Sequence, residues 1–291
     1  MALASAQAAL PVDHVEVRPG RTLAVHHRPG SNGVRLFFVH GSCASMLQFQ
    51  AMIAHFASLG HELIAYDWFG CGRSPKPRDW YAYCTAELSK DLAAVVDKYG
   101  GPSAAVQKKN VLVCHSAGCS LGLEFASQSS TPVDGLCLLA ALGGLSKFPV
   151  HPVFYLPALV LTWIQPTLSA GFEGLALSEK TREGASEDRR AVLALAKDVN
   201  GSNPMYMCKA YYRQVSLPSD DVVRAAGARV PIVLLCGAED KLVPSSLSEA
   251  LLPLLPAETT MHLVPETSHQ LMQEDPTAAC AHVEAFLKRI V

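Results

Sequence analysis

Short runs of apolar residues without polar alternation recur along the chain, at 34–39, 63–66, 111–114, 136–139 and 232–236. A continuous apolar run of this length is typical of a strand that is covered on both faces. Between the runs lie segments with apolar residues at every third or fourth position, which predict amphipathic helices, and another such segment ends the chain. This alternation predicts an α/β fold with a mostly parallel central sheet and helices on both faces.

Two of the predicted helices have end signals in the sequence. Thr85 is the candidate N-cap of a helix that continues to about Tyr99, and the Gly-Gly-Pro at 100–102 ends it. Asp275 followed by Pro276 is a capping residue with a proline in the first turn, and it predicts the start of the last helix.

The alternation stops between about residues 143 and 229. This segment has no convincing buried strand, whereas 156–164 and 186–197 have helical spacing, and it is too long to be a loop. It predicts a small helical subdomain inserted between two core strands. We therefore expect an N-terminal extension at 1–14, an α/β core at 15–142 and 230–291, and a helical cap insertion at 143–229.

Composition limits the classes of function. Apolar residues make up 49% of the chain and charged residues 17%, which is enough apolar material for a buried core. The 24 Lys and Arg residues against 26 Asp and Glu leave a formal charge of −2, so we expect no nucleic-acid partner. The nine cysteines form no Cys-x-x-Cys pair and several lie in apolar runs, which predicts buried thiols in a reducing compartment. We expect no metal and no cofactor.

The sequence has no clear targeting or membrane-spanning segment. Residues 1–10 lack a positive charge and a long apolar block, so no secretory signal or transit peptide is predicted. The apolar stretch 148–164 is interrupted by Pro149, Pro152 and Pro157, which disfavours a spanning helix. We expect a cytoplasmic protein, with association to membranes left open.

The first motif with chemical meaning is Cys114-His115-Ser116-Ala117-Gly118, between a predicted strand and an apolar helical stretch. This pattern predicts a nucleophile elbow, in which a tight turn lifts the serine hydroxyl off the sheet edge and the N-terminus of the following helix stabilises an oxyanion. Cys114 occupies a position that is usually glycine, so the turn must accommodate a Cβ atom. Alone, the pentapeptide also fits a serine that caps a helix.

Two loops further along supply an acid and a base. Asp240 follows the strand 232–236, at the sheet edge where ligands bind in open α/β folds, and its neighbour Glu239 is the competing acid. His269 lies between the last apolar run and the last helix. Nucleophile, acid and base then occur in the chain order of α/β-hydrolases and not of chymotrypsin or subtilisin, which predicts a triad of Ser116, Asp240 and His269.

The loop after the strand 34–39 predicts the oxyanion hole. In His40-Gly41-Ser42-Cys43 the glycine allows a turn that brings the N–H of Ser42 beside the N–H of Ala117. The same residues also fit an ordinary strand-to-helix turn.

A second glycine-rich turn, at 67–74, lacks the Gly-Lys-Ser/Thr ending of a phosphate loop. We interpret it as a structural turn in which Arg73 bonds to Asp67. Trp68 or Phe69 is expected to line the substrate pocket.

Taken together, the motifs resemble those of the α/β-hydrolase superfamily, in the subgroup of eukaryotic α/β-hydrolase-domain serine hydrolases (AB hydrolase-1 type) and related esterases. The resemblance covers about residues 15–291 and rests on residues 39–41, 67–74, 115–118, 237–244 and 268–269. It implies the fold, the triad and a cap. It says little about substrate, because the same set serves esterases, lipases, thioesterases, carbon–carbon hydrolases and haloperoxidases.

Some relatives differ at the site. Epoxide hydrolases and haloalkane dehalogenases use a carboxylate nucleophile, where this chain has Ser116. Acyltransferase-like members carry His-x4-Asp at the final histidine. In this chain Glu274 takes that place and Asp275 follows it, which leaves acyl transfer open.

The expected function is hydrolysis of a carboxylic ester through an acyl-enzyme intermediate. Apolar and aromatic residues of the cap favour a lipid or another apolar acyl ester as the substrate, or a cap face that contacts a membrane. We expect Phe154, Trp163 and Tyr206 to contact the substrate, although these side chains also fit simple packing of the cap on the core. The alternatives are an acyltransferase or thioesterase on the same triad, or a non-catalytic hydrolase-fold binding protein.

Overall fold

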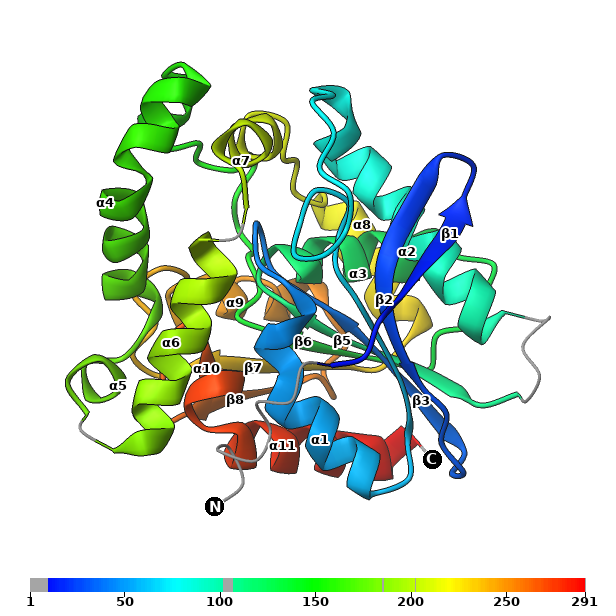
Figure 1. The fold of residues 1–291 in the computed structure, drawn as a ribbon. Coiled ribbons are helices and arrows are strands. Elements are labelled where there is room, and N and C mark those ends of the chain that lie inside the picture. The colour runs from blue at the N-terminus through cyan, green and yellow to red at the C-terminus, as the bar shows by residue number, and fades with distance from the viewer. Residues whose placement is uncertain (1–9, 102–106, 185, 202, 291) are drawn as a thin grey trace.

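An eight-stranded sheet runs through the centre of the molecule (Figure 1). The structure, a computed structural model, describes residues 10–101, 107–184, 186–201 and 203–290. The strands are β1 (Asp13–Arg18), β2 (Arg21–Arg28), β3 (Val34–Val39), β4 (Glu62–Tyr66), β5 (Lys109–His115), β6 (Gly135–Leu139), β7 (Ile232–Gly237) and β8 (Thr260–Val264). Their order across the sheet is β1-β2-β4-β3-β5-β6-β7-β8; the β1–β2 and β2–β4 pairs are antiparallel and the remaining pairs are parallel.

Helices cover both faces of this sheet (Figure 1). One face carries α1 (Gln50–Ser58), α10 (Leu271–Glu274) and α11 (Pro276–Ile290), and the other carries α2 (Thr85–Gly100), α3 (Ala117–Gln128) and α8 (Asp220–Arg229). Shorter elements are α9 (Ser245–Glu249) and the 3-10 turns η1 (Met46–Phe49), η2 (Tyr81–Tyr83), η3 (Pro152–Tyr155) and η4 (Leu252–Leu254). The predicted mostly parallel sheet with helices on both faces is confirmed.

The core consists of two apolar layers, one on each side of the sheet. Successive side chains of a strand point to opposite faces, so Phe37 and Val39 belong to one layer and Leu36 and Phe38 to the other. All four are fully buried. This two-sided burial explains why the central strands have continuous apolar sequences.

Four helices follow β6 before the chain returns to the sheet layer, namely α4 (Ala158–Ala176), α5 (Glu179–Glu183), α6 (Glu187–Gly201) and α7 (Met205–Tyr212). They contact the loops at the carboxyl ends of the parallel strands: the Asn203 amide donates to the Cys43 carbonyl at 2.6 Å, and the Gln270 N–H to the Ala176 carbonyl at 3.2 Å. The described residues of 143–229 contain no strand.

The predicted boundaries need two adjustments. Strand β1 begins at Asp13, inside the N-terminal extension predicted at 1–14, of which residues 1–9 lie outside the described part of the chain. Helix α8 falls inside the predicted insertion but packs against α3 in the layer that covers the sheet.

The predicted N-cap at Thr85 is wrong. Helix α2 begins at Thr85 itself and Cys84 is its N-cap. The Thr85 hydroxyl accepts a hydrogen bond from the N–H of Ser216 at 2.9 Å, so a tertiary contact takes the side chain that would otherwise cap the helix. The predicted end of this helix includes Pro102, which lies outside the described residues. At the last helix, Asp275 does cap the first turn by accepting from the N–H of Ala278 at 2.9 Å.

Two further features of the described residues are the hydrophobicity of their helices and the state of their cysteines. None of their helices combines the length and the hydrophobicity that crossing a bilayer requires. All nine cysteines are free thiols; Cys43 and Cys84 are half-buried and the others are buried.

Candidate active site

Ser116 sits at the turn between β5 and α3. Its backbone has φ 52° and ψ −121°, a left-handed conformation that costs a residue with a side chain about 1–3 kcal/mol and persists only where its surroundings fix it. The Ser116 N–H donates to the Leu139 carbonyl at 2.8 Å, which ties the turn to β6. The residue is 6% exposed.

Close packing around the elbow explains its small residues. A Cβ atom at Gly118 would lie 2.4 Å from the carbonyl oxygen of Val39, so α3 starts directly against the end of β3. The side chain of Cys114 extends toward α3, where a Cβ atom at Gly122 would lie 2.6 Å from its Sγ. Gly122 therefore provides the space for the side chain that departs from the usual glycine.

The predicted acid and the predicted base lie in the loops after β7 and β8. Asp240 Oδ2 lies 2.8 Å from His269 Nδ1, and both residues are buried. Asp240 Oδ1 accepts from the N–H groups of Leu242 and Val243, at 2.9 Å and 2.8 Å. The competing acid Glu239 is exposed, so the structure brings Asp240 rather than Glu239 to the imidazole.

His115 joins the loop of the base to the elbow. Its ring centroid lies 4.6 Å from that of His269, and its Nε2 lies 2.9 Å from the His269 carbonyl oxygen. Within the described part of the chain, no hydrogen bond joins the Ser116 hydroxyl to the His269 imidazole. Catalytic hydrogen bonds commonly tighten only when substrate binds. The loops that carry Ser116 and His269 are adjacent, and the imidazole has the acid on its Nδ1 side.

The loop at 40–43 passes close to the serine. A Cβ atom at Gly41 would lie 3.2 Å from the Cβ of Ser116, so glycine is required at this approach. The following Cys43 has a φ of 50°. Ala117 is the first residue of α3, where helices leave their N–H groups unpaired. Among the described residues, the N–H groups of Ser42 and Ala117 donate to no other group.

The turn at 67–74 is held by Asp67, but not through the side chain of Arg73. Asp67 Oδ2 accepts from the backbone N–H of Arg73 at 2.8 Å, and Oδ1 from the N–H of Met46 at 2.8 Å. The Arg73 guanidinium donates instead to the Leu10 carbonyl at 2.8 Å. Burial raises the pKa of the Asp67 carboxyl, although these two N–H groups oppose the rise.

Of the two aromatic residues predicted in this turn, Trp68 lies near the elbow. It stacks on His40 with ring centroids 4.7 Å apart, and it lines a cavity of about 10 Å³ that also touches Ala117. That volume matches a single water molecule. Phe69 instead packs beneath Arg21, whose guanidinium carbon lies 3.7 Å from the ring centroid.

The predicted cap contacts lie elsewhere. Trp163 is 84% exposed, so it projects into solvent. Phe154 stacks on Tyr212 with centroids 4.3 Å apart, and the Tyr206 hydroxyl donates to the Lys76 carbonyl. None of the three lines either described cavity. Contact of these three residues with a substrate therefore stays a prediction, because aromatic composition does not determine which way a side chain points.

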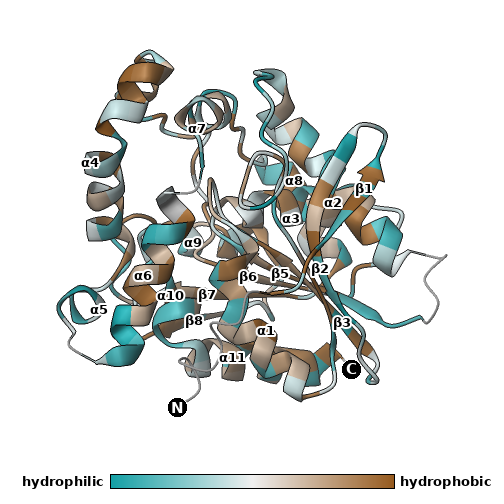
Figure 2. Ribbon diagram, viewed as in Figure 1, coloured by the Kyte–Doolittle hydropathy of each residue, from teal (hydrophilic) through white to brown (hydrophobic). Residues whose placement is uncertain are grey.

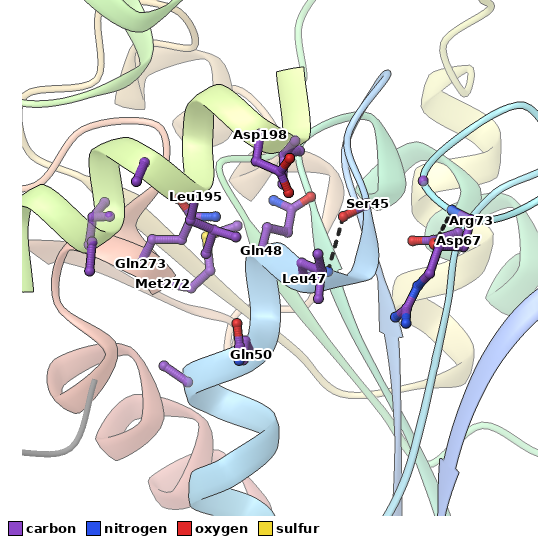
Figure 3. A pocket seen from close by; sticks show the side chains of 16 residues that line it. Ser45, Leu47, Gln48, Gln50, Asp67, Arg73, Leu195, Asp198, Met272 and Gln273 are labelled. Carbon is purple, nitrogen blue, oxygen red and sulfur yellow. Dashed lines mark hydrogen bonds between the residues drawn. The ribbon is translucent and has the colours of Figure 1, made fainter. Parts of the chain in front are cut away.

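A larger cavity of about 520 Å³ lies between α6, the η1–α1 segment and α10 (Figure 3). Figure 3 shows Leu195 and Asp198 of α6 facing Gln48 of η1 and Gln273 of α10 across it. The volume is within the range of small-molecule pockets. No residue of the predicted triad or oxyanion hole lines it.

Gln48, which the sequence motifs do not indicate, is a polar residue that contacts several loops of the candidate site. Gln48 bonds to Gly41, His115 and Gln270, one residue each from the oxyanion loop, the elbow and the loop of the base. Its one signal in the sequence is an amide within the apolar stretch 46–49. No group of three or more His, Cys, Asp or Glu side chains in the described ranges could hold a metal ion.

The fold, the elbow and the chain order of the site residues define an α/β-hydrolase. Within that class, the chain belongs to the family described as serine aminopeptidase, S33, which matches residues 31–276.

Individual relatives are more distant. Protein ABHD8 of Bos taurus is 29% identical over 256 residues, which cover 87% of this chain and 56% of that protein, so the chain spans about half the length of this relative. The structure superposes on a bromoperoxidase from Bacillus anthracis with a TM-score of 0.77 at 16% identity, covering 96% of this chain and 100% of that one. It superposes on the esterase RhEst1 from Rhodococcus sp. ECU1013 with a TM-score of 0.75 at 19% identity, covering 96% and 99%. At these identities the superpositions establish the fold alone.

Proposed function

We propose that the chain is a serine hydrolase that cleaves a carboxylic ester, with Ser116 as nucleophile, His269 as base and Asp240 as the residue that orients the base. The observation that carries the proposal is the buried His269–Asp240 pair, 2.8 Å apart, on a loop bonded to the strained serine turn. Because the Asp240 carboxylate accepts a hydrogen bond from Nδ1, the neutral imidazole keeps its proton on Nδ1. Its Nε2 is therefore free to take the proton of the serine.

The reaction follows from these roles. His269 removes the hydroxyl proton as Ser116 Oγ attacks the acyl carbonyl, and the N–H groups of Ser42 and Ala117 stabilise the oxyanion. The imidazolium then protonates the leaving alcohol, which departs as the acyl-enzyme forms. Water, deprotonated by His269, attacks the acyl-enzyme and releases the acid and the free serine.

We further propose a lipid or another apolar acyl ester as the substrate and α4–α7 as its cap. The cavity of about 10 Å³ beside Ala117 has no room for an acyl group, so binding requires its apolar lining, which includes Leu142, Phe148 and Tyr211, to move aside. Phe148 and Tyr211 belong to the segment of the cap, which supports a role for this segment in admitting the substrate. RhEst1, on which the structure superposes, is an esterase, which agrees with an ester substrate but does not specify one.

The contacts of Glu274 favour hydrolysis over acyl transfer. Glu274 Oε2 accepts from the N–H of Ser268 at 2.6 Å, and its Oε1 accepts from the N–H and the hydroxyl of Ser178, at 2.8 Å and 2.7 Å. Both carboxylate oxygens therefore hold the loop of the base against the segment between α4 and α5. Because the carboxylate holds these two segments together, we assign it a structural role and not a role in binding the acceptor of an acyl transfer.

We also propose that the first half of α4 and the preceding turn contact lipid. Leu159 is 85% exposed, Trp163 84% and Tyr155 60%, and Figure 2 shows an apolar end of α4 that stands away from the sheet. Residues 135–172 contain no Asp or Glu. The Lys209 ammonium lies 2.7 Å from the Leu156 carbonyl, and the Arg213 guanidinium stacks 3.8 Å over Tyr155. Aromatic and leucine side chains beside cations suit a surface of anionic lipid.

A fluorophosphonate probe tests the central proposal, because it reacts only with an activated serine. We expect labelling at Ser116 and hydrolysis of p-nitrophenyl esters, both lost in Ser116→Ala and both kept in Ser127→Ala, a matched change on the same helix. A non-catalytic binding protein would stay unlabelled, and that result would reject the enzyme. A steep fall in kcat/KM from short to long acyl chains would reject the lipid substrate while leaving the esterase.

A further inference from the structure

The buried amide of Gln48 lies where three loops of the proposed active site meet. Gln48 is 1% exposed. Its Oε1 lies 2.9 Å from the backbone nitrogen of Gly41, and its Nε2 lies 2.7 Å from His115 Nδ1 and 3.4 Å from Gln270 Oε1. One side chain thus bonds to the oxyanion loop, to the residue before the nucleophile and to the residue after the base.

The chemistry of the partners fixes the direction of every bond. The Gly41 N–H is a donor, so the amide oxygen of Gln48 must face it. The Gln48 NH₂ then donates to His115 Nδ1, which must be unprotonated. The proton of His115 is therefore on Nε2, which donates to the His269 carbonyl at 2.9 Å.

His115 is neutral in this arrangement. Burial lowers its pKa well below the ordinary value, and the neighbouring His269 lowers it further. A protonated His115 would carry a proton on Nδ1 facing the NH₂ of Gln48, so the hydrogen bonds and the burial favour the same state.

We propose that Gln48 is a positioning residue of the enzyme: through one chain of hydrogen bonds it fixes the spacing of the oxyanion loop, the nucleophile elbow and the loop of the base. The proposal rests on the proposed function, because the spacing matters only if these loops act on one substrate. Gln48 acts through Gly41 and His115 and not on the substrate itself. A misplacement of about 1 Å between catalytic groups can cost about 10²-fold in rate, so even a partial loss of this chain is measurable.

Two substitutions separate the contributions of the two ends of the Gln48 amide, its oxygen and its NH₂ group. Gln48→Glu still offers an oxygen, now of a carboxylate, to the Gly41 N–H, but it has no proton to donate to His115. The His115 ring then moves its proton to Nδ1 and turns an unprotonated Nε2 toward the His269 carbonyl, where two acceptors repel. Gln48→Leu removes both ends. Gln273→Leu is the matched control, because Gln273 is a buried amide on the same cavity whose Oε1 has no hydrogen-bond partner among the described residues.

The experiment measures ester hydrolysis and the protonation of His115 in the full chain. We expect kcat to fall about 10- to 100-fold in both Gln48 variants, with KM within about threefold and with Gln273→Leu close to wild type. Nitrogen NMR of labelled histidine should report the Nε2–H form of His115 in the wild type and the Nδ1–H form in Gln48→Glu. A purely structural role would change thermal unfolding without this change of tautomer.

The outcomes separate this proposal from the one it rests on. An active wild type whose kcat is unchanged in both Gln48 variants would overturn the positioning role alone. So would a wild type in which His115 carries its proton on Nδ1. A wild type that neither hydrolyses esters nor reacts with fluorophosphonate would overturn the enzyme itself, and the positioning role with it.

Discussion

Hydrogen bonds to both oxygens of the Asp240 carboxylate hold it in place beside the imidazole of His269. Oδ2 lies 2.8 Å from His269 Nδ1, while Oδ1 accepts from the N–H groups of Leu242 and Val243, at 2.9 Å and 2.8 Å. Because two backbone donors occupy one oxygen, the other oxygen cannot turn away from the ring. The orientation of the imidazole therefore depends on the backbone of the loop after β7.

This geometry predicts a large effect of Asp240→Asn. The asparagine oxygen must face the two backbone donors, so its NH₂ group faces His269 Nδ1. The ring proton must then lie on Nε2, and a protonated Nε2 cannot accept the serine proton. We expect kcat for ester hydrolysis to fall about 10⁴-fold. The control is Glu239→Gln, which makes the same chemical change at the exposed neighbour and should keep full activity. A loss of less than tenfold in Asp240→Asn would contradict the assigned role of the acid.

The contact between Cys114 and Gly122 predicts a coupled effect on stability. Gly122→Ala places a methyl group 2.6 Å from the Cys114 Sγ, and overpacking of this kind lowers the free energy of unfolding by about 1–3 kcal/mol. Combining it with Cys114→Ala should restore most of that loss. Urea unfolding of the two single variants and the double variant gives the coupling energy.

A second glycine serves as the control for this comparison of single and double variants. Gly171 in α4 has nothing within 4 Å of its virtual Cβ, so Gly171→Ala should be neutral or stabilising. Additive effects of Gly122→Ala and Cys114→Ala would show that the two side chains do not compete for the same space.

Two buried histidines predict loss of stability in acid. Burial lowers the pKa of His40 from 6.5 to about 3, and the pKa of His115 also falls well below 6.5. Below pH 6.5 the unfolded chain therefore binds protons that the folded chain does not, so the free energy of unfolding decreases as the pH falls. The contribution of His40 reaches about 2 kcal/mol by pH 5.

His40→Gln should reduce this dependence on pH, because it removes a buried histidine whose pKa is lowered to about 3. Urea unfolding at pH 7 and pH 5 measures it, and the difference between the two values should be smaller in the variant. His14→Gln, at an exposed position of β1, should leave the difference as it is in the wild type. An equal difference in all three proteins would mean that His40 titrates normally in the folded state.

The sequence predicted the central strands but not the antiparallel pair β1 and β2. The central strands are buried on both faces, so their apolar runs stand out, whereas β1 is an edge strand whose residues are exposed or half-buried. Strand β2 begins with Arg21, which is buried because it pairs with Asp91, its Nε lying 3.0 Å from the carboxylate. A sequence pattern cannot indicate that a charged residue is buried with a partner 70 positions away.

The same distinction applies to the site. Ser116, Asp240 and His269 are predictable because the ends of parallel strands meet at one edge of the sheet, whatever the details of packing. Gln48 is not predictable, since its partners lie 7, 67 and 222 positions away and only the folded chain brings them to one amide. The direction of Trp163 depends likewise on how α4 packs, and composition alone does not contain that information.

The exposed end of α4 predicts binding to anionic membranes. The full chain should sediment with vesicles of equal parts phosphatidylcholine and phosphatidylserine, and far less with phosphatidylcholine alone, because Lys209 and Arg213 lie beside the apolar residues. Leu159→Ala and Trp163→Ala should each weaken binding about tenfold or more, since each large apolar side chain contributes about 1.5–3 kcal/mol when it leaves water.

The control for this surface is Leu175→Ala, which removes an exposed leucine from the far end of the same helix. It should bind vesicles as the wild type does, whereas Lys209→Ala and Arg213→Ala should lose only the part of binding that requires phosphatidylserine and that salt screens. Equal losses in Leu159→Ala and Leu175→Ala would indicate general stickiness of an apolar helix. In that case the proposed contact between the first half of α4 and lipid would have to be abandoned, because binding would not depend on which part of the helix is apolar.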